Sequence, residues 1–600
     1  MTVSRSLSLL ILLFLSQIVL SQDAMIRGTV RDDNGTVIPQ ALIYVEVLGL
    51  AISSDSLGRY EIQVPGNREI EVKATYPSYL PFSRTLTLNP GEAKKLNITL
   101  KISELLRVDV IDEAVRYAPI ERLSPKLQRR IPSPTGGIEA LLIGQLGVSA
   151  NNELSSTYSV RGGSFDENLV YVNDIEVYRP FLTRSGNQEG LSFANPDMTS
   201  DILFSSGGFD AKYGDKMSSV LDVKYSRPER TEGSFQGGLL GGAVHYGGVN
   251  RNGRLGHITG FRYRTNQSLL GTLDDQGDYR SRFFDLQTYL TYGLSDTWQL
   301  EFLGNISSNL YNFIPRTRTT QLGSINEALQ LTVFFEGQEI TDYETYFGAF
   351  SFTNTPVPQT KLKYIVSAFR TYEREKFDVF GQYRLDELER DLGSDEFGEV
   401  VRNLGIGAYL DHARNSLDAT VMNVEHKGIS THGNHTILWG LGARNERIND
   451  RLSEWGLIDS AGYSVPHNPN GPIVLDDLIR SSNELNSQRF TAYAQDNVAW
   501  TARDSSIWDL SAGMRGQHWT YNGQTMVSPR ARIAYKPQWK SVLIDSNLVK
   551  RDVIFKAAVG IYYQAPFYRE LRDLSGAVNQ DIRAQRSIHF VTGADMLIKL

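Results

Sequence analysis

From residue 217 onward, apolar and polar residues alternate along segments whose length is typical of β-strands. Trp508 and Leu510, for example, alternate with Asp509 and Ser511. A period of two residues places the apolar side chains on one face of a strand and the polar side chains on the other. The pattern predicts about fourteen strands. They are expected at 217–226, 233–248, 254–266, 281–293, 297–311, 342–354, 361–374, 415–429, 434–449, 486–501, 506–520, 526–538, 551–563 and 591–600.

The connections between these segments alternate between short and long. The short ones are 250–253, 293–298, 354–360, 432–434 and 502–506, and the long ones are 267–280, 312–341, 375–414, 450–485 and 564–590. Three connections depart from this rule, namely 227–232, 521–525 and 539–550. Short turns on one side and long loops on the other are typical of a transmembrane β-barrel. The pattern therefore predicts an antiparallel barrel with periplasmic turns and extracellular loops.

The tryptophans agree with this orientation. Trp298, Trp500, Trp508 and Trp539 lie beside predicted short connections, and Trp439 lies a few residues from one. Amphipathic rings of this kind form a girdle where the membrane meets water. The alternative is that they are core tryptophans at strand ends.

The first part of the chain has a different organisation. Residues 25–101 contain short alternating segments separated by Gly, Pro and Asp turn signals, which predict a small antiparallel β-sandwich. Residues 102–135 are charged and punctuated by prolines, which indicates a linker. It contains the short β-prone segment Val108–Ile111, which either pairs within this chain or adds to the sheet edge of a partner. Residues 136–225 predict a mixed α/β unit whose helix begins near Gly137.

Composition narrows the class of protein. The chain has 600 residues, no cysteine and a formal net charge of −7. Its length predicts two or more domains, its lack of cysteine excludes disulfides and thiol chemistry, and its charge gives no reason to expect nucleic acid. Arg5 followed by the apolar run Leu7–Leu20 predicts a signal peptide over 1–21, with an uncleaved anchor helix as the alternative. An exported chain without a long apolar helix is either soluble or an outer-membrane barrel.

Two segments resemble known families. GTVRDDNGTVIPQALIYV followed by SDSLGRYEIQVP resembles the carboxypeptidase regulatory-like domain, which implies an accessory β-sandwich over 22–101 without an active site. The stretch from Ile138 to Val223, with GV at 147–148, RGG at 161–163, VND at 172–174 and GGF at 207–209, resembles the plug of TonB-dependent outer-membrane receptors. This resemblance implies a plug over 136–216 and a transmembrane barrel over 217–600.

The second resemblance also implies how the protein works. Receptors of this family bind an extracellular ligand and import it when the periplasmic protein TonB pulls on a short TonB box. By position, Val108, Asp109, Val110 and Ile111 are the candidate TonB box. The expected partners are TonB, outer-membrane lipid and an extracellular ligand, with a surface lipoprotein as a further one. The sequence does not distinguish a siderophore, glycan, peptide or vitamin.

Alternative functions are an adhesin or signalling receptor that binds without import and, less favoured, a secreted enzyme. We expect no enzyme activity, no cofactor and no metal site. No phosphate-binding loop of the Walker type occurs in the sequence, so nucleotide is not the expected energy source. Barrels of this plugged class have 22 strands, so about eight are expected to be missing, and a closed fourteen-stranded barrel is the alternative.

Several residues with functional side chains also have a purely structural interpretation. Arg161, Gly162 and Gly163 are expected to form a tight bend, with Arg161 paired to a carboxylate of the barrel wall, and an anion site made by their backbone N–H groups is the alternative. Asn173 and Asp174 are expected to form a turn. Asp166 and Glu167 resemble an acid–base pair, but no nucleophile accompanies them, so turn and wall contacts are favoured. Two histidines at 432 and 435 fall in a predicted hairpin turn. The acidic run 386–399 suits calcium chemically, but a solvated loop is favoured.

Overall fold

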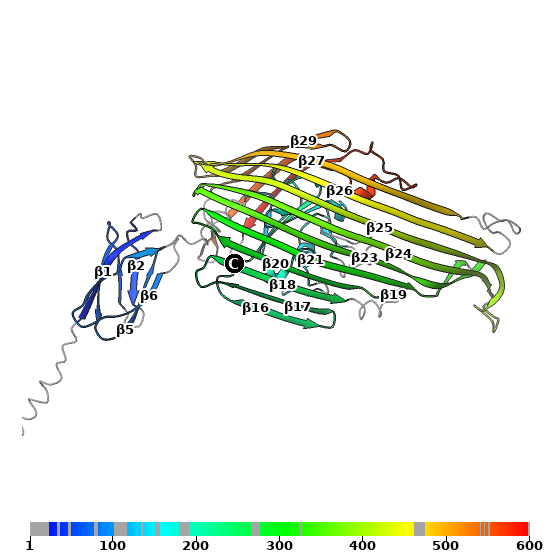
Figure 1. Ribbon diagram of the computed structural model, residues 1–600, viewed down its shortest axis with the longest axis horizontal. Helices are drawn as coiled ribbons and strands as arrows, with labels where there is room; N and C mark the ends of the chain where they lie inside the picture. Colours follow the sequence, from blue (N-terminus) through cyan, green and yellow to red (C-terminus); the bar gives the residue numbers. More distant parts are fainter. Residues whose placement is uncertain are drawn as a thin grey trace, which may run out of the picture. The chain divides into compact units, whose positions relative to one another are not determined.

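The computed structural model describes most of the chain, and Figure 1 shows the strands and helices of each part. The described residues are 23–32, 37–45, 50–76, 82–100, 117–128, 130–131, 133, 136–150, 156–178, 191–265, 277–324, 327–460, 475–539, 542–544, 547–549 and 552–597. The predicted signal peptide over 1–21 and the candidate TonB box at 108–111 lie outside them. The chain divides into two units, Met1–Ala114 and Val115–Leu600.

The first unit is a β-sandwich made of two four-stranded sheets. Alternation along β4 buries Tyr60, Ile62 and Val64 and exposes the residues between them. These side chains join Ile43 and Val72 in one apolar core. The sandwich is not purely antiparallel as predicted, because β7 and β8 run parallel to β1. The strands are β1 (Asp23–Asp32), β2 (Leu42–Val45), β3 (Leu50–Ser53), β4 (Arg59–Pro65), β5 (Glu69–Thr75), β6 (Phe82–Thr87), β7 (Ala93–Lys95) and β8 (Ile98–Leu100).

The second unit begins with a small inner domain whose central sheet has the order β13-β12-β15-β14-β9. All five residues of β12 and six of seven in β15 are buried, so this sheet is covered on both faces. Its elements are β9 (Glu121–Leu123), α3 (Pro125–Gln128), α4 (Glu139–Ile143), β10 (Val148–Ser149), β11 (Ser159–Val160), η2 (Phe165–Glu167), β12 (Asn168–Val172), β13 (Ile175–Glu176), η3 (Pro196–Met198), β14 (Thr199–Ser205) and β15 (Ser219–Tyr225). The predicted first barrel strand, 217–226, is therefore wrong: it is β15 of the inner domain, where it pairs with β12 and β14.

The rest of the unit is a large antiparallel sheet whose strands follow one another in chain order from β16 to β33. They are β16 (Glu232–Gly238), β17 (Gly241–Val249), β18 (Leu255–Thr265), β20 (Arg282–Gly293), β21 (Trp298–Pro315), β23 (Glu327–Val357), β24 (Thr360–Leu388), β25 (Val400–His432), β26 (His435–Ser460), β27 (Asp477–Thr501), β28 (Ile507–Trp519), β29 (Gln524–Lys536), β32 (Asp552–Gln564) and β33 (Gln585–Leu597). Two short strands, β19 (Gly277–Tyr279) and β22 (Arg318–Ser324), pair at its margin, and β30 (Val542–Ile544) pairs with β31 (Asn547–Val549) separately.

The predicted alternation is confirmed, but two kinds of boundary were wrong. The segment 233–248 is two strands joined by a tight turn at Leu239–Leu240, because the glycines on either side permit the reversal. Much of the predicted long connections at 312–341, 375–414 and 450–485 is strand, and β23 and β25 reach 31 and 33 residues. These extensions contain many charged residues and glycines, although the backbone pairs continue and Leu329, Leu331 and Val333 still share one face of β23.

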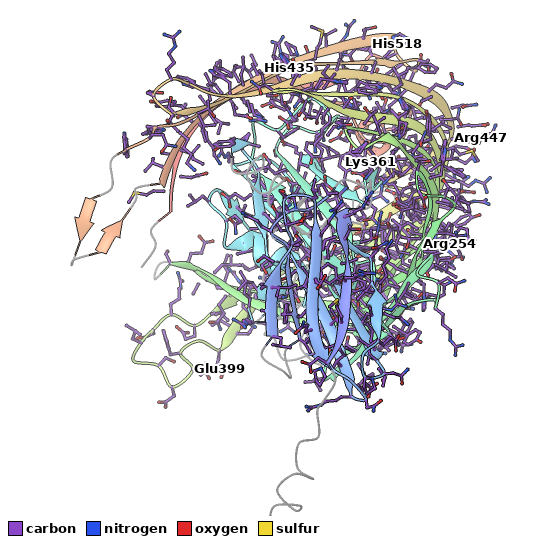
Figure 2. All side chains as sticks on the ribbon, turned by 90° about the vertical axis from the view of Figure 1, so that its left-hand side faces the viewer. Arg254, Lys361, Glu399, His435, Arg447 and His518 are labelled. Atoms are coloured by element: carbon purple, nitrogen blue, oxygen red, sulfur yellow. The ribbon has the colours of Figure 1, made fainter. Side chains whose placement is uncertain are left out.

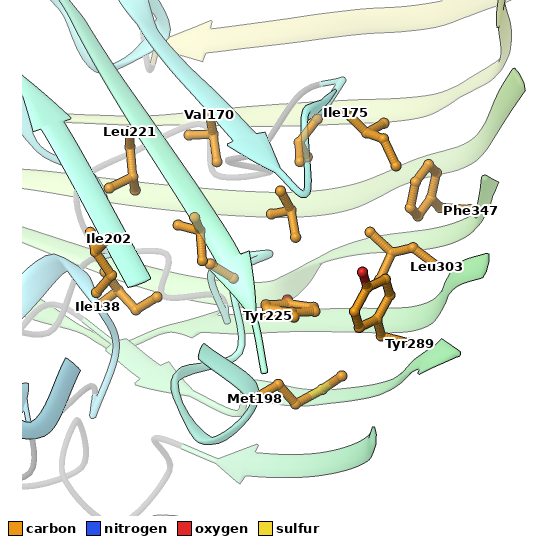
Figure 3. Packing of buried hydrophobic residues seen from close by; sticks show 14 of the residues in the cluster. Ile138, Val170, Ile175, Met198, Ile202, Leu221, Tyr225, Tyr289, Leu303 and Phe347 are labelled. Atoms are coloured by element: carbon orange, nitrogen blue, oxygen red, sulfur yellow. The ribbon is translucent and has the colours of Figure 1, made fainter. Parts of the chain in front are cut away.

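The large sheet curves around the inner domain, and Figure 2 shows this arc. Its terminal strands β16 and β33 are not paired to each other among the described residues, so the arc is open, in contrast to the alternative of a closed fourteen-stranded barrel. One apolar cluster joins the inner domain to the large sheet, which is called the wall below (Figure 3). Met198 and Tyr225 of the inner domain pack with Tyr289, Leu303 and Phe347 of the wall. The inner domain therefore packs directly against the inner face of the curved sheet.

The outer face of the sheet carries large apolar side chains. Val366, Met422, Val424, Leu441 and Phe490 are between 47% and 62% exposed, and each lies on the face opposite the inner domain. Trp298, Trp500 and Trp539, near the short turns, are also exposed. A contiguous apolar surface of this kind marks contact with another phase or molecule.

No helix among the described residues is both long and apolar enough to cross a membrane.

Candidate functional site

The segment 161–168 forms a tight bend at the start of the central sheet of the inner domain. Arg161 and Gly162 both have positive φ, 50° and 83°, and a Cβ on Gly163 would lie 1.9 Å from Ser218 Oγ. Glu167 accepts hydrogen bonds from the Ser164 amide at 3.1 Å and from the Ser218 hydroxyl at 2.6 Å. The carboxylate of Glu167 therefore stabilises the bend through these two hydrogen bonds.

Arg161 does not make its predicted contact with the wall. Its guanidinium donates to Ser206 Oγ at 3.2 Å, within the inner domain, and its side chain is exposed. No ion pair joins Arg161 to a wall carboxylate among the described residues, so the predicted pairing was wrong. Asp166 does reach the wall, where Gln564 Nε2 donates to its Oδ2 at 3.2 Å.

Asn173 and Asp174 form the two-residue turn between β12 and β13. Both have positive φ, 53° and 71°, as a type I′ hairpin turn requires. Asn173 Oδ1 accepts from the Tyr225 amide at 2.9 Å, and Asp174 forms ion pairs with Lys224 and, at 2.9 Å, with wall residue Lys363. Burial raises the pKa of the Asp174 carboxyl, but the surrounding lysines outweigh burial and hold it well below its usual range. The turn is thereby attached to both sheets.

Further acids of the inner domain pair with cations of the wall. Glu176 accepts from Arg444 at 2.8 Å, Asp215 from Arg515 at 3.3 Å, and Asp210 from Arg532 at 3.2 Å. Burial opposes ionisation of Asp215, but Arg515 and Arg444 outweigh burial and lower its pKa. Buried carboxylates of the inner domain therefore pair with buried arginines of the wall where the inner domain and the wall pack together.

Residues 207–214 form a second attachment to the wall. Arg530 donates to the carbonyl oxygens of Asp210 at 2.7 Å and Tyr213 at 2.6 Å, and its guanidinium lies 4.2 Å from the ring centre of Tyr562. The Gly208 amide donates to His589 Nδ1 at 3.3 Å. Sequence reasoning did not assign Arg530 and Arg532 to the site. Their alternation with Ala531 and Ile533 was the available signal, because it places both arginines on the inner face.

The connection between β32 and β33 folds into the interior. Tyr568 donates to Asp450 at 3.0 Å, and Arg569 donates to Glu373 at 2.6 Å. The side chains of Tyr568 and Leu571 pack with Trp519 in an apolar cluster. The predicted long connection 564–590 thus exists, but its central part lies against the inner face of the wall.

A narrow cavity of about 50 Å³ remains between the inner domain, the wall and this infolded connection. Lys216 of the inner domain, Arg444 and Arg489 of the wall, and Tyr568 contribute to its lining. Burial lowers the pKa of Lys216 to about 8. A space of this size holds only a few water molecules, so this part of the interior is closed in the present conformation.

Other candidate residues have local contacts. His432 contacts Ser430 at 2.9 Å and His435 contacts Asp496 at 2.7 Å, both at the hairpin turn. In the acidic run 386–399, Glu389 accepts from the amides of Arg390 and Asp391. Within the described ranges, no group of three His, Cys, Asp or Glu side chains is placed to hold a metal ion.

Comparison with known families identifies the first unit. Residues 25–101 match the model of the carboxypeptidase regulatory-like domain, which confirms the resemblance predicted from the sequence. Comparison with curated protein sequences gives no match.

Comparison with solved structures gives similarities at low sequence identity. The outer membrane transporter YddB from Escherichia coli is 13% identical with a TM-score of 0.49, over 81% of this chain and 69% of that one. The siderophore receptor PirA from Acinetobacter baumannii is 14% identical with a TM-score of 0.47, over 80% and 69%. The RagAB peptide importer in its closed-closed state is 8% identical with a TM-score of 0.45, over 80% and 65%.

Proposed function

We propose that this protein is a receptor of the bacterial outer membrane that binds an extracellular ligand and imports it by rearranging its inner domain, using energy transmitted by TonB. The observation that carries the proposal is an inner domain packed against the concave face of a curved antiparallel sheet whose outer face is apolar. A polar interior filled by a separate domain beneath an apolar exterior is the arrangement of a plugged barrel. The plug of the proposal is residues 136–216, extended by β15.

The plug is attached in a way that allows rearrangement. Its contacts with the wall include ion pairs such as Asp174–Lys363, Glu176–Arg444 and Asp215–Arg515. Water can replace such contacts one after another when the plug shifts, whereas a wholly apolar contact would have to be exposed at once. A force applied to the chain before the plug is thus the trigger for opening in this proposal.

That force requires a site for TonB. We assign it to Val108–Ile111, which precedes the plug in sequence and combines β-branched residues with one acid. An extended segment of this type binds by adding a strand to the edge of a partner's sheet, through main-chain hydrogen bonds. Proline at the centre of the segment removes one donor and fixes φ, which disrupts this mode of pairing.

A peptide of residues 102–116 tests the assignment by titration with the purified periplasmic domain of TonB. The unmodified peptide is expected to bind, Val110→Pro is expected to abolish binding, and Ser103→Pro, outside the segment, is the matched control. Equal binding of the Val110→Pro and unmodified peptides would refute the assignment. Absence of binding by every peptide would favour a receptor or adhesin that acts without TonB.

A further inference from the structure

The connection between β32 and β33, residues 565–584, lies across the inner face of the wall and is called the strap below. The strand register places four side chains of the wall in one row. Glu373 of β24 is opposite Leu417 of β25, which is opposite Asp450 of β26. Asp450 is in turn opposite Asn483 of β27, and these four strands lie side by side in Figure 1. The strap crosses this row and contacts each of its three polar side chains.

Two arginines of the strap pair with two buried acids of this row. Arg569 pairs with Glu373 at 2.6 Å, and Arg572 pairs with Asp450 at 3.1 Å. The Glu373 and Asp450 side chains are only 4% and 2% exposed, and Tyr568 donates a further hydrogen bond to Asp450 at 3.0 Å. Neighbouring strands are about 4.8 Å apart, so two acids that are separated by two strands lie about 10 Å apart. The strap therefore presents two cations at the spacing of these acids.

The strap is held in shape by its own backbone and held in place by side chains. Within it, the Asn579 amide donates to the carbonyl oxygen of Leu571 at 2.7 Å. Its contacts with the wall instead involve side chains, as where Asn483 donates to the carbonyl oxygen of Gly576 at 2.8 Å. The strap can therefore leave the row as a unit while the backbone pairing of β24 to β27 stays intact.

The space beneath the strap contains a buried acceptor without a partner. The narrow cavity of about 50 Å³ is lined by Glu446 of the wall and by Tyr568 and Leu571 of the strap, among others. Glu446 Oε2 lies 3.2 Å from Arg489, but Glu446 Oε1 is buried and accepts no hydrogen bond among the described residues. This oxygen is available to a further N–H donor that enters the cavity.

Removal of the strap would leave this part of the wall with an excess of negative charge. Arg444 and Arg489 are already paired, with a carboxylate of the inner domain and one of the wall. Glu373 and Asp450 would lose the arginines that neutralise them, and a third acid, Glu375, follows Glu373 on the same face. Buried carboxylates without a partner are costly. A ligand that replaces the strap therefore needs cations of its own.

We propose that the strap occupies a site for cationic ligands, and that a ligand with two cationic groups about 10 Å apart, such as a basic peptide, displaces it by pairing with Glu373 and Asp450. This inference rests on the proposed receptor function and names the chemistry of the ligand. The strap belongs to the long connections, which face the outside of the cell in that function. Leu417, Ile448 and Trp519 beneath the strap supply an apolar surface between the two acids. The strap keeps this surface covered until such a ligand replaces it.

A single thiol reports whether the strap is in place. The chain contains no cysteine, so Leu485→Cys, buried beneath the strap, gives a protein with one thiol. In detergent, its rate of labelling by a maleimide should rise roughly tenfold when Arg569 and Arg572 are both replaced by glutamine, because both ion pairs of the strap are lost. The same replacement of Arg583 and Arg586, two exposed arginines near the end of the connection, is the control and should not change the rate.

Two probe peptides test the chemistry of the ligand. Acetylated triarginine amide is cationic, and the same peptide with citrulline in place of arginine has nearly the same shape without the charge. Binding is measured by the fluorescence anisotropy of dye-labelled peptides, and only triarginine should bind and accelerate labelling of the thiol. Replacing Arg569 and Arg572 by glutamine should tighten triarginine binding, because the competing strap is released. Glu373→Gln with Asp450→Asn also releases the strap but should weaken binding roughly tenfold, whereas Glu396→Gln with Glu399→Gln, at exposed positions, should not.

Opposite effects of the two double variants on binding separate a ligand site from a purely structural contact. An unchanged labelling rate in the arginine variant, equal binding of the citrulline peptide, or undiminished triarginine binding by the acid variant would each overturn the proposal. The titration of residues 102–116 with TonB tests the proposed function separately. Binding of TonB together with a strap that does not respond refutes the strap site alone. A responsive strap without TonB binding refutes TonB-driven import and leaves the strap site standing.

Discussion

Replacing Asp215 by asparagine removes one charge from the contact between the inner domain and the wall and leaves the shape of this contact nearly unchanged. Asp215 has a φ of 65°, a left-handed conformation that asparagine also tolerates, so the backbone should not be strained. Its carboxylate pairs with Arg515, and the two side chains are 10% and 8% exposed. The substitution therefore leaves Arg515 buried without its counter-charge.

The expected magnitude follows from this burial. Breaking a buried ion pair by removing one partner costs about 3–5 kcal/mol. The lower value applies, because the two closest contacts are long, at 3.3 and 3.4 Å, and because Arg515 retains a cation–π contact with Tyr493. A loss of about 3 kcal/mol corresponds to about a hundredfold larger population in which the inner domain is detached from the wall. At lower pH the unmodified protein should approach the variant, since a carboxylate with a lowered folded pKa stabilises the fold only above that pKa.

Hydrogen exchange measured by mass spectrometry on the detergent-solubilised protein tests this expectation. Peptides covering β12 and β15 should exchange about a hundredfold faster in Asp215→Asn, whereas peptides of β24 and β25 should not change. Asp296→Asn, at an exposed short turn, is the control and should match the unmodified protein. If β15 keeps its full protection in the variant, the ion pair does not couple the plug to the wall and the reasoning is wrong.

Two further predictions concern single buried side chains. Burial raises the pKa of Glu139, partly offset by Ser192, Arg262 and Arg264, so its folded pKa lies above its unfolded value and stability falls as pH rises between the two. Glu139→Gln should therefore raise the midpoint of thermal unfolding more at pH 7 than at pH 4. Glu399→Gln, at an exposed position, is the control and should not show this difference. An equal shift of the Glu139→Gln midpoint at both pH values would contradict the prediction. In the isolated sandwich, residues 22–101, Ile43→Ala should lower the free energy of unfolding by about 2–5 kcal/mol, because Ile43 is buried in the core. Urea denaturation measures this loss, and Thr85→Ala at an exposed position is the control. A loss no larger than that of the control would exclude Ile43 from the core.

Much of the fold could be predicted because it depends on local periodicity. Alternation located β18, β20, β28 and β29 to within a few residues, since each side of these strands meets a different environment. The far ends of β23 and β25 were predicted as loops, because charged residues and glycines occur throughout them. The alternation of Leu329 and Leu331 with Gln330 was nevertheless an available signal for the extended strand β23.

The candidate site could be predicted only in part. The turn at Asn173 and Asp174 follows from residue types that accept positive φ. The wall partners of these residues could not be predicted, because Lys363 and Lys427 are about two hundred residues or more away in the chain. For Arg161 the sequence indicated the bend, but its partner Ser206 is 45 residues away in the chain and could not be read from the motif.

The amino-acid sequence alone determined the mainly β character of this chain, the carboxypeptidase regulatory-like sandwich over 25–101 and the alternation of its wall strands. These features depend on neighbouring residues and on turn chemistry, which are local properties of the chain. The tertiary structure alone decided that β15 belongs to the inner domain, that residues 565–584 fold inward and that acids of the inner domain meet cations of the wall. Each of these features depends on which distant segments pack together. The sequence of a strand that is buried on both faces, or of a charged residue that points inward, does not specify its partner.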